Sequence, residues 1–246
     1  MRPGRGVVAR AQRPAGAGDS VFVLAVSGRF TARQRRHWER KRRFLDPRDP
    51  GPQAFARPKL AWALRHLAVD RTTSVLDVGA GNGTFTWHWS ELAGRVVGAD
   101  FSRNLIGRSP SRGVMVQADA ARLPFRDMEF DVVAEGNFLH HVADPARVLE
   151  EMTRVSRRHL VLVEPNRWHL PMAMFMVFHP PDWRGLRYDR GHVRRLAELA
   201  GLRVLSAEPQ GAIYPNQTPP RLLRPLARFD RPSRIGAYVV AVLEKP

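Results

Sequence analysis

The chain contains no cysteine, although it is 246 residues long. This absence excludes disulfides, thiolate metal ligands and every reaction that uses a cysteine nucleophile. Lysine is almost as scarce, since Lys41, Lys59 and Lys245 are the only lysines among 40 basic residues. Such a strong preference for arginine is more typical of a GC-rich genome than of a nucleic-acid-binding surface.

Long hydrophobic runs are also missing. The two longest, residues 21–26 and 172–178, are far shorter than the roughly 20 residues that a membrane-spanning helix needs. The first is also too short for the apolar region of a signal peptide. We therefore expect a cytoplasmic protein without a transmembrane segment. Its 43% hydrophobic and 26% charged residues are typical of a globular domain.

The formal charge of +17 is unevenly distributed. Residues 1–43 carry twelve basic and two acidic side chains, so the remainder is only moderately basic. Residues 1–20 have no hydrophobic period, and we interpret residues 1–30 as a disordered or mis-annotated extension. A basic arm can contact phosphates or anionic lipid, but we favour a solvated segment.

From residue 31 onward, helical and strand patterns alternate. Residues 31–70 should form N-terminal helices, over 31–45 and 58–68, separated by a proline-rich break at 46–52. The predicted strands are residues 74–79, 95–100, 113–119, 130–136, 159–165, 203–208 and 237–243. Helices are predicted between them, over residues 84–93, 102–107, 145–156 and 190–200. Apolar strands that alternate with helices favour an α/β fold with a parallel sheet covered on both faces.

The most informative segment is VLDVGAGNGTF, residues 75–85. An apolar strand carries Asp77 near its carboxyl end, and Gly79, Gly81 and Gly83 follow at alternate positions. Glycines there permit positive φ angles and allow a ligand to lie against bare main chain. The helix that opens next would direct free N–H groups at that ligand.

Acidic residues follow at the ends of the next two predicted strands. Asp100 lies where an acidic side chain can accept both hydroxyls of a ribose, and Asp119 ends the third strand. Because ligands of open parallel sheets bind beyond the carboxyl ends of the strands, Asp77, Asp100 and Asp119 should line one crevice. The glycine spacing differs from the dinucleotide fingerprint, and no phosphate-binding GKS or GKT sequence occurs.

These segments, together with DAARLPFRDMEFDVV (residues 119–133) and LHHV (139–142), resemble the class I S-adenosylmethionine-dependent methyltransferases. The most similar branch is the small-molecule one that includes the quinone-biosynthesis enzymes, the methyltransferase type 11 family. The resemblance covers about residues 74–165. It implies a Rossmann-like, seven-stranded, mostly parallel sheet with an antiparallel last strand. The methyltransferase domain would span residues 71–246, and the helices of residues 31–70 would cap its cofactor site.

The resemblance also implies roles for individual residues. Asp77 and the backbone of Gly79, Ala80 and Gly81 would hold the methionine part of S-adenosylmethionine, and Gly83 would permit close helix packing. Asp100 would bind the ribose, and Phe101, Asp119 and Ala120 would contact the adenine. Backbone carbonyls at the end of the fourth strand would complete the site, from Glu135, Gly136 and Asn137.

For catalysis, His140 and His141 follow the fourth strand, where the methyl group would emerge, and either is a candidate general base. They could equally shape the pocket. Residues 166–190 and 209–236 are predicted substrate-side insertions, the latter too rich in proline for one regular element. Residues 171–183 form either an apolar pocket wall or an ordinary amphipathic helix, and the HPPDW within them is interpreted as a loop.

The sequence thus predicts methyl transfer from S-adenosylmethionine to a small organic acceptor, at oxygen or carbon. Two alternatives remain open: an RNA methyltransferase that uses the basic N-terminal arm, and a non-catalytic partner protein that binds S-adenosylmethionine. We identify no metal ligands and do not expect nucleic acid as a partner. The acceptor and the oligomeric state do not follow from the sequence.

Overall fold

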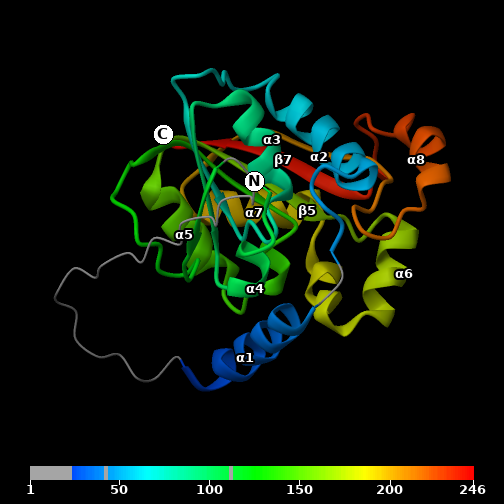
Figure 1. Ribbon diagram of the computed structural model, residues 1–246, viewed down its shortest axis with the longest axis horizontal. Coiled ribbons are helices and arrows are strands. Elements are labelled where there is room, and N and C mark those ends of the chain that lie inside the picture. Colours follow the sequence, from blue (N-terminus) through cyan, green and yellow to red (C-terminus); the bar gives the residue numbers. More distant parts are fainter. Residues whose placement is uncertain (1–23, 42–43, 111–112) are drawn as a thin grey trace, which may run out of the picture.

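The computed structural model of the chain describes residues 24–41, 44–110 and 113–246 (Figure 1). Most of the predicted N-terminal extension, residues 1–30, lies outside these described residues. The first helix, α1, spans Leu24–Arg40 and therefore begins before residue 31, where the sequence placed its start. No helix of the described residues combines the length and the hydrophobicity that a bilayer span needs.

A seven-stranded sheet in the order β3-β2-β1-β4-β5-β7-β6 forms the centre of the structure. The strands are β1 (Ser74–Val78), β2 (Arg95–Asp100), β3 (Val114–Gln117), β4 (Phe130–Gly136), β5 (Ser156–Pro165), β6 (Arg203–Gln210) and β7 (Tyr238–Glu244). Strands β1 to β5 pair in parallel, whereas β7 runs antiparallel to both β5 and β6. The predicted fold class, including the antiparallel last strand, is confirmed.

Helices flank the sheet on both sides (Figure 1). The α-helices after α1 are α2 (Pro50–Ala63), α3 (Thr84–Leu92), α4 (Arg103–Ile106), α5 (Pro145–Val155), α6 (Leu170–Phe178), α7 (Arg190–Leu199) and α8 (Pro220–Ala227). Two 3-10 segments, η1 (Leu139–His141) and η2 (Pro180–Arg187), follow β4 and α6. Both of these short segments lie next to the site described below.

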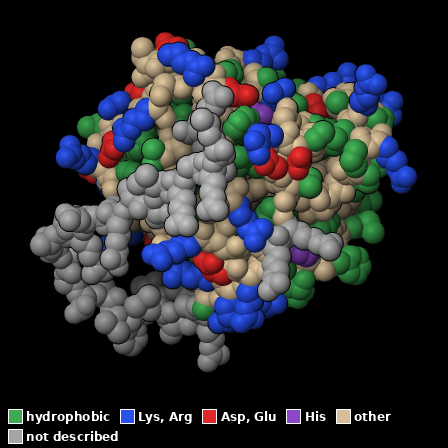
Figure 2. All heavy atoms as spheres, viewed as in Figure 1, with side chains coloured by type: hydrophobic (Ala, Val, Ile, Leu, Met, Phe, Trp, Pro, Cys, Tyr) green, Lys and Arg blue, Asp and Glu red, His purple; other side chains and the backbone are tan. Residues whose placement is uncertain are grey.

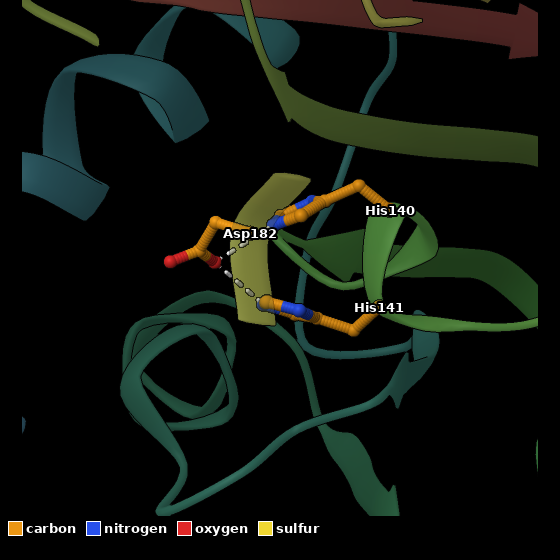
Figure 3. A group of neighbouring side chains, drawn as sticks. All are labelled: His140, His141 and Asp182. Carbon is orange, nitrogen blue, oxygen red and sulfur yellow. Dashed lines mark hydrogen bonds and ion pairs between the residues drawn. The ribbon is translucent and has the colours of Figure 1, made fainter. Parts of the chain in front are cut away.

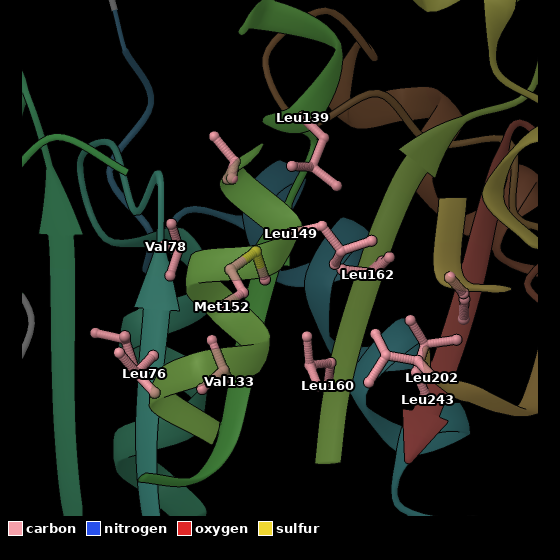
Figure 4. Close-up of a cluster of buried hydrophobic side chains, with 14 of the residues drawn as sticks. Leu76, Val78, Val133, Leu139, Leu149, Met152, Leu160, Leu162, Leu202 and Leu243 are labelled. Atoms are coloured by element: carbon pink, nitrogen blue, oxygen red, sulfur yellow. The ribbon is translucent and has the colours of Figure 1, made fainter. Parts of the chain in front are cut away.

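Successive strand residues enter two different hydrophobic cores, because side chains alternate across a sheet. Val75 of β1 packs in a cluster with Phe55 of α2 and Trp89 of α3. Its neighbour Leu76 belongs to the opposite cluster, which includes Leu149 of α5 (Figure 4). Burial on both faces explains why these strands are nearly continuous apolar runs in the sequence.

Proline caused one difference between prediction and structure. Helix α2 begins at Pro50, although residues 46–52 were expected to interrupt the helix. Helix α8, which begins at Pro220, occupies only part of residues 209–236, so this segment is not one regular element, as its prolines predicted. Proline at the first helical positions removes no intrahelical hydrogen bond, so it starts helices as readily as it ends them.

Candidate functional site

A cavity of about 1440 Å³ opens at the carboxyl ends of β1, β2 and β4. Strand β1 pairs with β2 on one side and with β4 on the other, so the strand order reverses here. This is the position at which open α/β sheets bind ligands. Residues of α1, η1 and η2 form the remaining walls of the cavity.

Asp100 ends β2 at the floor of this cavity, where it is only 6% exposed. Its Oδ2 accepts a hydrogen bond from the Gly81 N–H at 2.9 Å, and its Oδ1 accepts one from the Ser102 N–H at 2.8 Å. Burial raises the pKa of Asp100, although these two donors oppose the shift. The carboxylate is thus fixed beside the glycine-rich turn, with lone pairs left for further donors.

Asp77 is the more deeply buried of the two acids, near the end of β1. The Thr86 hydroxyl of α3 donates to its Oδ2 at 2.5 Å, which connects the strand with the helix that follows. Burial raises the pKa of Asp77 to about 7, and the hydrogen bond from Thr86 limits the rise. At neutral pH this carboxyl therefore exists in both protonation states.

The turn between β1 and α3 has the backbone that the glycines predicted. Gly79, Gly81 and Gly83 have φ angles of 69°, 57° and 88°. A Cβ atom on Gly79 would lie 2.1 Å from the ring of Phe138, so side chains are excluded there for steric reasons as well. The turn leaves its main chain facing the cavity, with Thr84 and neighbouring residues in the wall.

Helix α1 covers the far end of the cavity, near β3. Arg35 of α1 places its guanidinium 5.6 Å from the ring of Phe101 and 3.8 Å from the carboxylate of Asp119. Asp119 is partly exposed, two residues after the end of β3. The Phe101 ring and the Asp119 carboxylate therefore lie on the cavity side that α1 closes.

Most of the residues predicted from the sequence are brought together here. Those that line the cavity are Asp77, Gly79, Ala80, Gly81, Asp100, Phe101, Asp119, Ala120, Gly136, Asn137 and His141. Gly83, Glu135 and His140 do not line it. The Glu135 side chain points into the protein, where its carboxyl accepts from the Val163 N–H at 2.9 Å. Burial and the neighbouring Glu164 raise the pKa of Glu135 well above its usual value.

His140 is buried outside the cavity lining, between the carboxylates of Glu164 and Asp182. Figure 3 shows Asp182 next to both histidines. The His140 Nδ1 is 2.8 Å from Glu164 Oε2, and its Nε2 is 3.4 Å from Asp182 Oδ1. Burial alone would lower the pKa of His140, but the two carboxylates outweigh it and raise the pKa to about 9. His140 is thus a cation at neutral pH and is suited to positioning rather than to accepting a proton.

His141 has the opposite environment and faces the cavity. Its Nδ1 is 3.2 Å from the Pro181 carbonyl oxygen, and its Nε2 is 3.3 Å from Asp182 Oδ1. The Trp38 ring of α1 packs edge-on against it at 5.0 Å. Burial and the charge of His140 lower the pKa of His141 well below 6.5. His141 is therefore neutral at neutral pH and can accept a proton.

Asp182 and Glu164 were missed in the sequence. HPPDW was interpreted as a loop, but its last four residues begin the 3-10 segment η2, which returns Asp182 to the histidine pair. No local pattern reveals this contact, because 42 positions separate His140 from Asp182. The ligand atoms of His140, His141 and Asp182 lie within 4.8 Å of one another, a spacing that a divalent cation could also bridge.

The segment that supplies much of this cavity is similar in sequence to known methyltransferases. Residues 76–163 match the family described as Methyltransferase domain. The chain is 33% identical over 128 residues to demethylmenaquinone methyltransferase of Shouchella clausii, which is 47% of this chain and 54% of that protein. It is 37% identical over 106 residues to the Thermobifida fusca enzyme of the same name, 40% of this chain and 45% of that protein. The chain thus spans about half the length of the curated relatives it matches.

Solved structures share the fold at low sequence identity. A SAM-dependent methyltransferase from Thermotoga maritima superposes with a TM-score of 0.61 at 18% identity, covering 79% of this chain and 91% of that one. A SAM-dependent methyltransferase from Aquifex aeolicus superposes with a TM-score of 0.58 at 17% identity, and the match covers 82% of this chain and 100% of that one. A [4+2]-cyclase superposes with a TM-score of 0.57 at 18% identity, and the match covers 82% of this chain and 84% of that one. The fold alone therefore does not determine the reaction.

The sheet order and the site at its switch point define a class I methyltransferase fold. Residues 76–163 match the Methyltransferase domain family, and the chain is distantly similar to the demethylmenaquinone methyltransferases. S-adenosylmethionine is the cosubstrate of that family.

Proposed function

We propose that this chain transfers a methyl group from S-adenosylmethionine to a small organic acceptor, at oxygen or carbon. The observation that carries the proposal is the single cavity that joins Asp100 and the glycine-rich turn at one end to His141 at the other. The matched methyltransferase domain contains all of these residues.

The residues present suit S-adenosylmethionine. The bare backbone at Gly79 and Gly81 leaves room for the methionine part, and the Asp100 carboxylate retains acceptors for the ribose hydroxyls. Phe101 and Asp119 lie where they can contact the adenine. When bound, S-adenosylmethionine supplies a methyl group on a sulfonium centre that is already activated for in-line displacement. The protein then needs chiefly to align the acceptor and exclude water.

The rest of the cavity can hold the acceptor. Its volume of about 1440 Å³ exceeds the roughly 300–1,000 Å³ of a pocket for one small ligand. The wall beyond the glycine-rich turn is aromatic, with Trp38, Phe138 and Trp183 near His141. We therefore expect a planar or apolar acceptor.

His141 is the general base that the geometry favours over His140. Its Nε2 would take the proton of an acceptor hydroxyl or acidic carbon. Asp182 Oδ1, at 3.3 Å, would then stabilise the imidazolium. His140, held between Glu164 and Asp182, keeps Asp182 in place.

An acceptor screen tests this function. The chain would be incubated with S-adenosylmethionine and a panel of phenols, hydroquinones and enolisable carbonyl compounds, and S-adenosylhomocysteine would be quantified. We expect acceptor-dependent product, which His141→Gln lowers by about 10²–10⁴-fold without loss of S-adenosylhomocysteine affinity. His159→Gln, on β5 and outside the cavity wall, is the control. If His141→Gln retains full turnover, His141 is not the base.

A further inference from the structure

Helix α6 is apolar on all sides. Its sequence, LPMAMFMVF, contains no charged residue and no hydrogen-bonding side chain. Met172 and Met176 point inward and are 3% and 1% exposed. A helix that is hydrophobic all round is expected in a protein core or in lipid, yet the outer side of α6 faces solvent.

The outward residues of α6 form one continuous stripe. Leu170, Met174, Val177 and Phe178 recur at the spacing of a single helical face, and they are between 50% and 81% exposed. Trp168 precedes this stripe and is 64% exposed. At the other end, Trp183 is 54% exposed.

The six exposed residues are called the α6 face below. The Trp183 indole N–H donates to the Val177 carbonyl oxygen at 2.8 Å, so Trp183 lies against the end of α6. Hydrophobic side chains gather at the lower right of Figure 2, in the region of α6. Soluble monomers rarely expose such a cluster of large apolar side chains without a partner.

Basic residues outnumber acidic ones around the α6 face. Between residues 166 and 187 the one acid, Asp182, is buried, whereas the segment contains three arginines. Residues 221–234 add five exposed arginines, which are Arg221, Arg224, Arg228, Arg231 and Arg234. The His169 ring lies 2.8 Å from the Ile235 carbonyl oxygen, which places the end of that segment beside the start of α6. A recess of about 480 Å³ next to Trp168 is lined by Arg167, Arg190, Arg195 and Arg234. The recess also contains Asp189 and Glu208, which pair with Arg167 and Arg190.

We propose that the α6 face docks on the surface of an anionic lipid bilayer. The apolar stripe would enter the region between headgroups and acyl chains, and the surrounding arginines would contact anionic headgroups. Trp168, at one end of the stripe, suits that boundary, because its indole has an apolar body and one polar N–H. A second copy of the chain would instead bring the same arginines against one another.

The α6 face also adjoins the cavity, since Trp183 belongs to both. Arg184 and Arg187 line the same cavity. An apolar acceptor dissolved in the bilayer would thus enter next to Trp183. This last step rests on the proposed methyl transfer, whereas docking itself does not.

Vesicle flotation of the full chain without cosubstrate tests the proposal. Phosphatidylcholine vesicles would be compared with vesicles that also contain phosphatidylglycerol. The variant L170S/F178S removes two large side chains from the α6 face. The matched control, M128S/L199S, removes two side chains that are 56% and 82% exposed elsewhere on the surface. A chain without residues 1–23 tests whether the basic N-terminal segment is responsible.

We expect the parent, the M128S/L199S control and the shortened chain to float with the anionic vesicles. L170S/F178S should partition at least about ten-fold more weakly, because two apolar side chains no longer leave water. Equal flotation of L170S/F178S and the parent would overturn the proposal, as would loss of flotation only in the shortened chain. A dimer that L170S/F178S dissociates, in a parent that binds no vesicle, would assign the face to a second copy. S-adenosylhomocysteine calorimetry on the same samples reports separately on the proposed function.

Discussion

His140 and His141 are adjacent in the chain but differ in charge, because their neighbours differ. His140 lies between the carboxylates of Glu164 and Asp182, and its pKa rises to about 9 despite burial. His141 is buried next to that cation, and its pKa falls well below 6.5. The HH pair in the sequence does not reveal this difference, because it depends on the distant Glu164 and Asp182.

Replacing Glu164 with glutamine should change the pKa values of both His140 and His141. His140 loses its nearest negative charge, so its pKa should fall from about 9. With less positive charge on His140, the pKa of His141 should rise toward 6.5. Imidazole NMR signals followed as a function of pH in the parent and in Glu164→Gln measure both shifts. A His141 signal that titrates identically in the two proteins would contradict the assigned coupling.

Asp100 is the second residue whose role can be measured directly. Asp100→Ala removes the carboxylate expected to bind the ribose and should weaken S-adenosylhomocysteine binding several-fold or more. Asp127→Ala is a suitable control, because the Asp127 side chain is 71% exposed and lies outside the cavity wall. If calorimetry finds the same affinity for Asp100→Ala as for the parent, the ribose assignment is wrong.

At the scale of elements, the strands and the turn after β1 were the most predictable parts. Burial on both faces makes the strands apolar runs in the sequence. The turn needs glycines because its residues adopt positive φ angles. The segments that form the cavity wall opposite the sheet were less predictable, because they depend on tertiary contacts. Segment η2 is an example, since its position is set by Asp182 against the histidines and by Pro181 against Gln34 of α1.

Gly79 in the turn after β1 can be compared with Gly201, which has a similar φ angle away from the cavity. Gly79→Ala should weaken both folding and S-adenosylhomocysteine binding, because its Cβ would meet the Phe138 ring at 2.1 Å as well as a φ of +69°. Gly201→Ala has a similar φ of +71° but no atom within 4 Å of the new Cβ. It should cost only about 1–2 kcal/mol of unfolding free energy and leave binding intact. Thermal unfolding and calorimetry would compare the two, and equal effects on binding would argue against a ligand at the turn.

For the whole molecule, the sequence was sufficient for the sheet, its antiparallel last strand and most of the cavity floor. The strands and the cavity floor depend on periodicity and on residues at strand ends, both of which are local, whereas the antiparallel last strand was expected only from the family resemblance. The α6 face was not predicted as a surface, because residues 171–183 were equally compatible with a pocket wall or a packed helix. Burial of Met172 and Met176 with exposure of Phe178 emerges only when the sheet and α6 are placed together.

Every role proposed for this site requires that the cavity at the switch point of the sheet binds S-adenosylmethionine. Calorimetric titration of the full chain with S-adenosylhomocysteine, alongside a parallel titration with NAD, tests it most directly. We predict saturable one-site binding of S-adenosylhomocysteine and no binding of NAD. Binding of NAD in place of S-adenosylhomocysteine, or of neither ligand, would contradict the account.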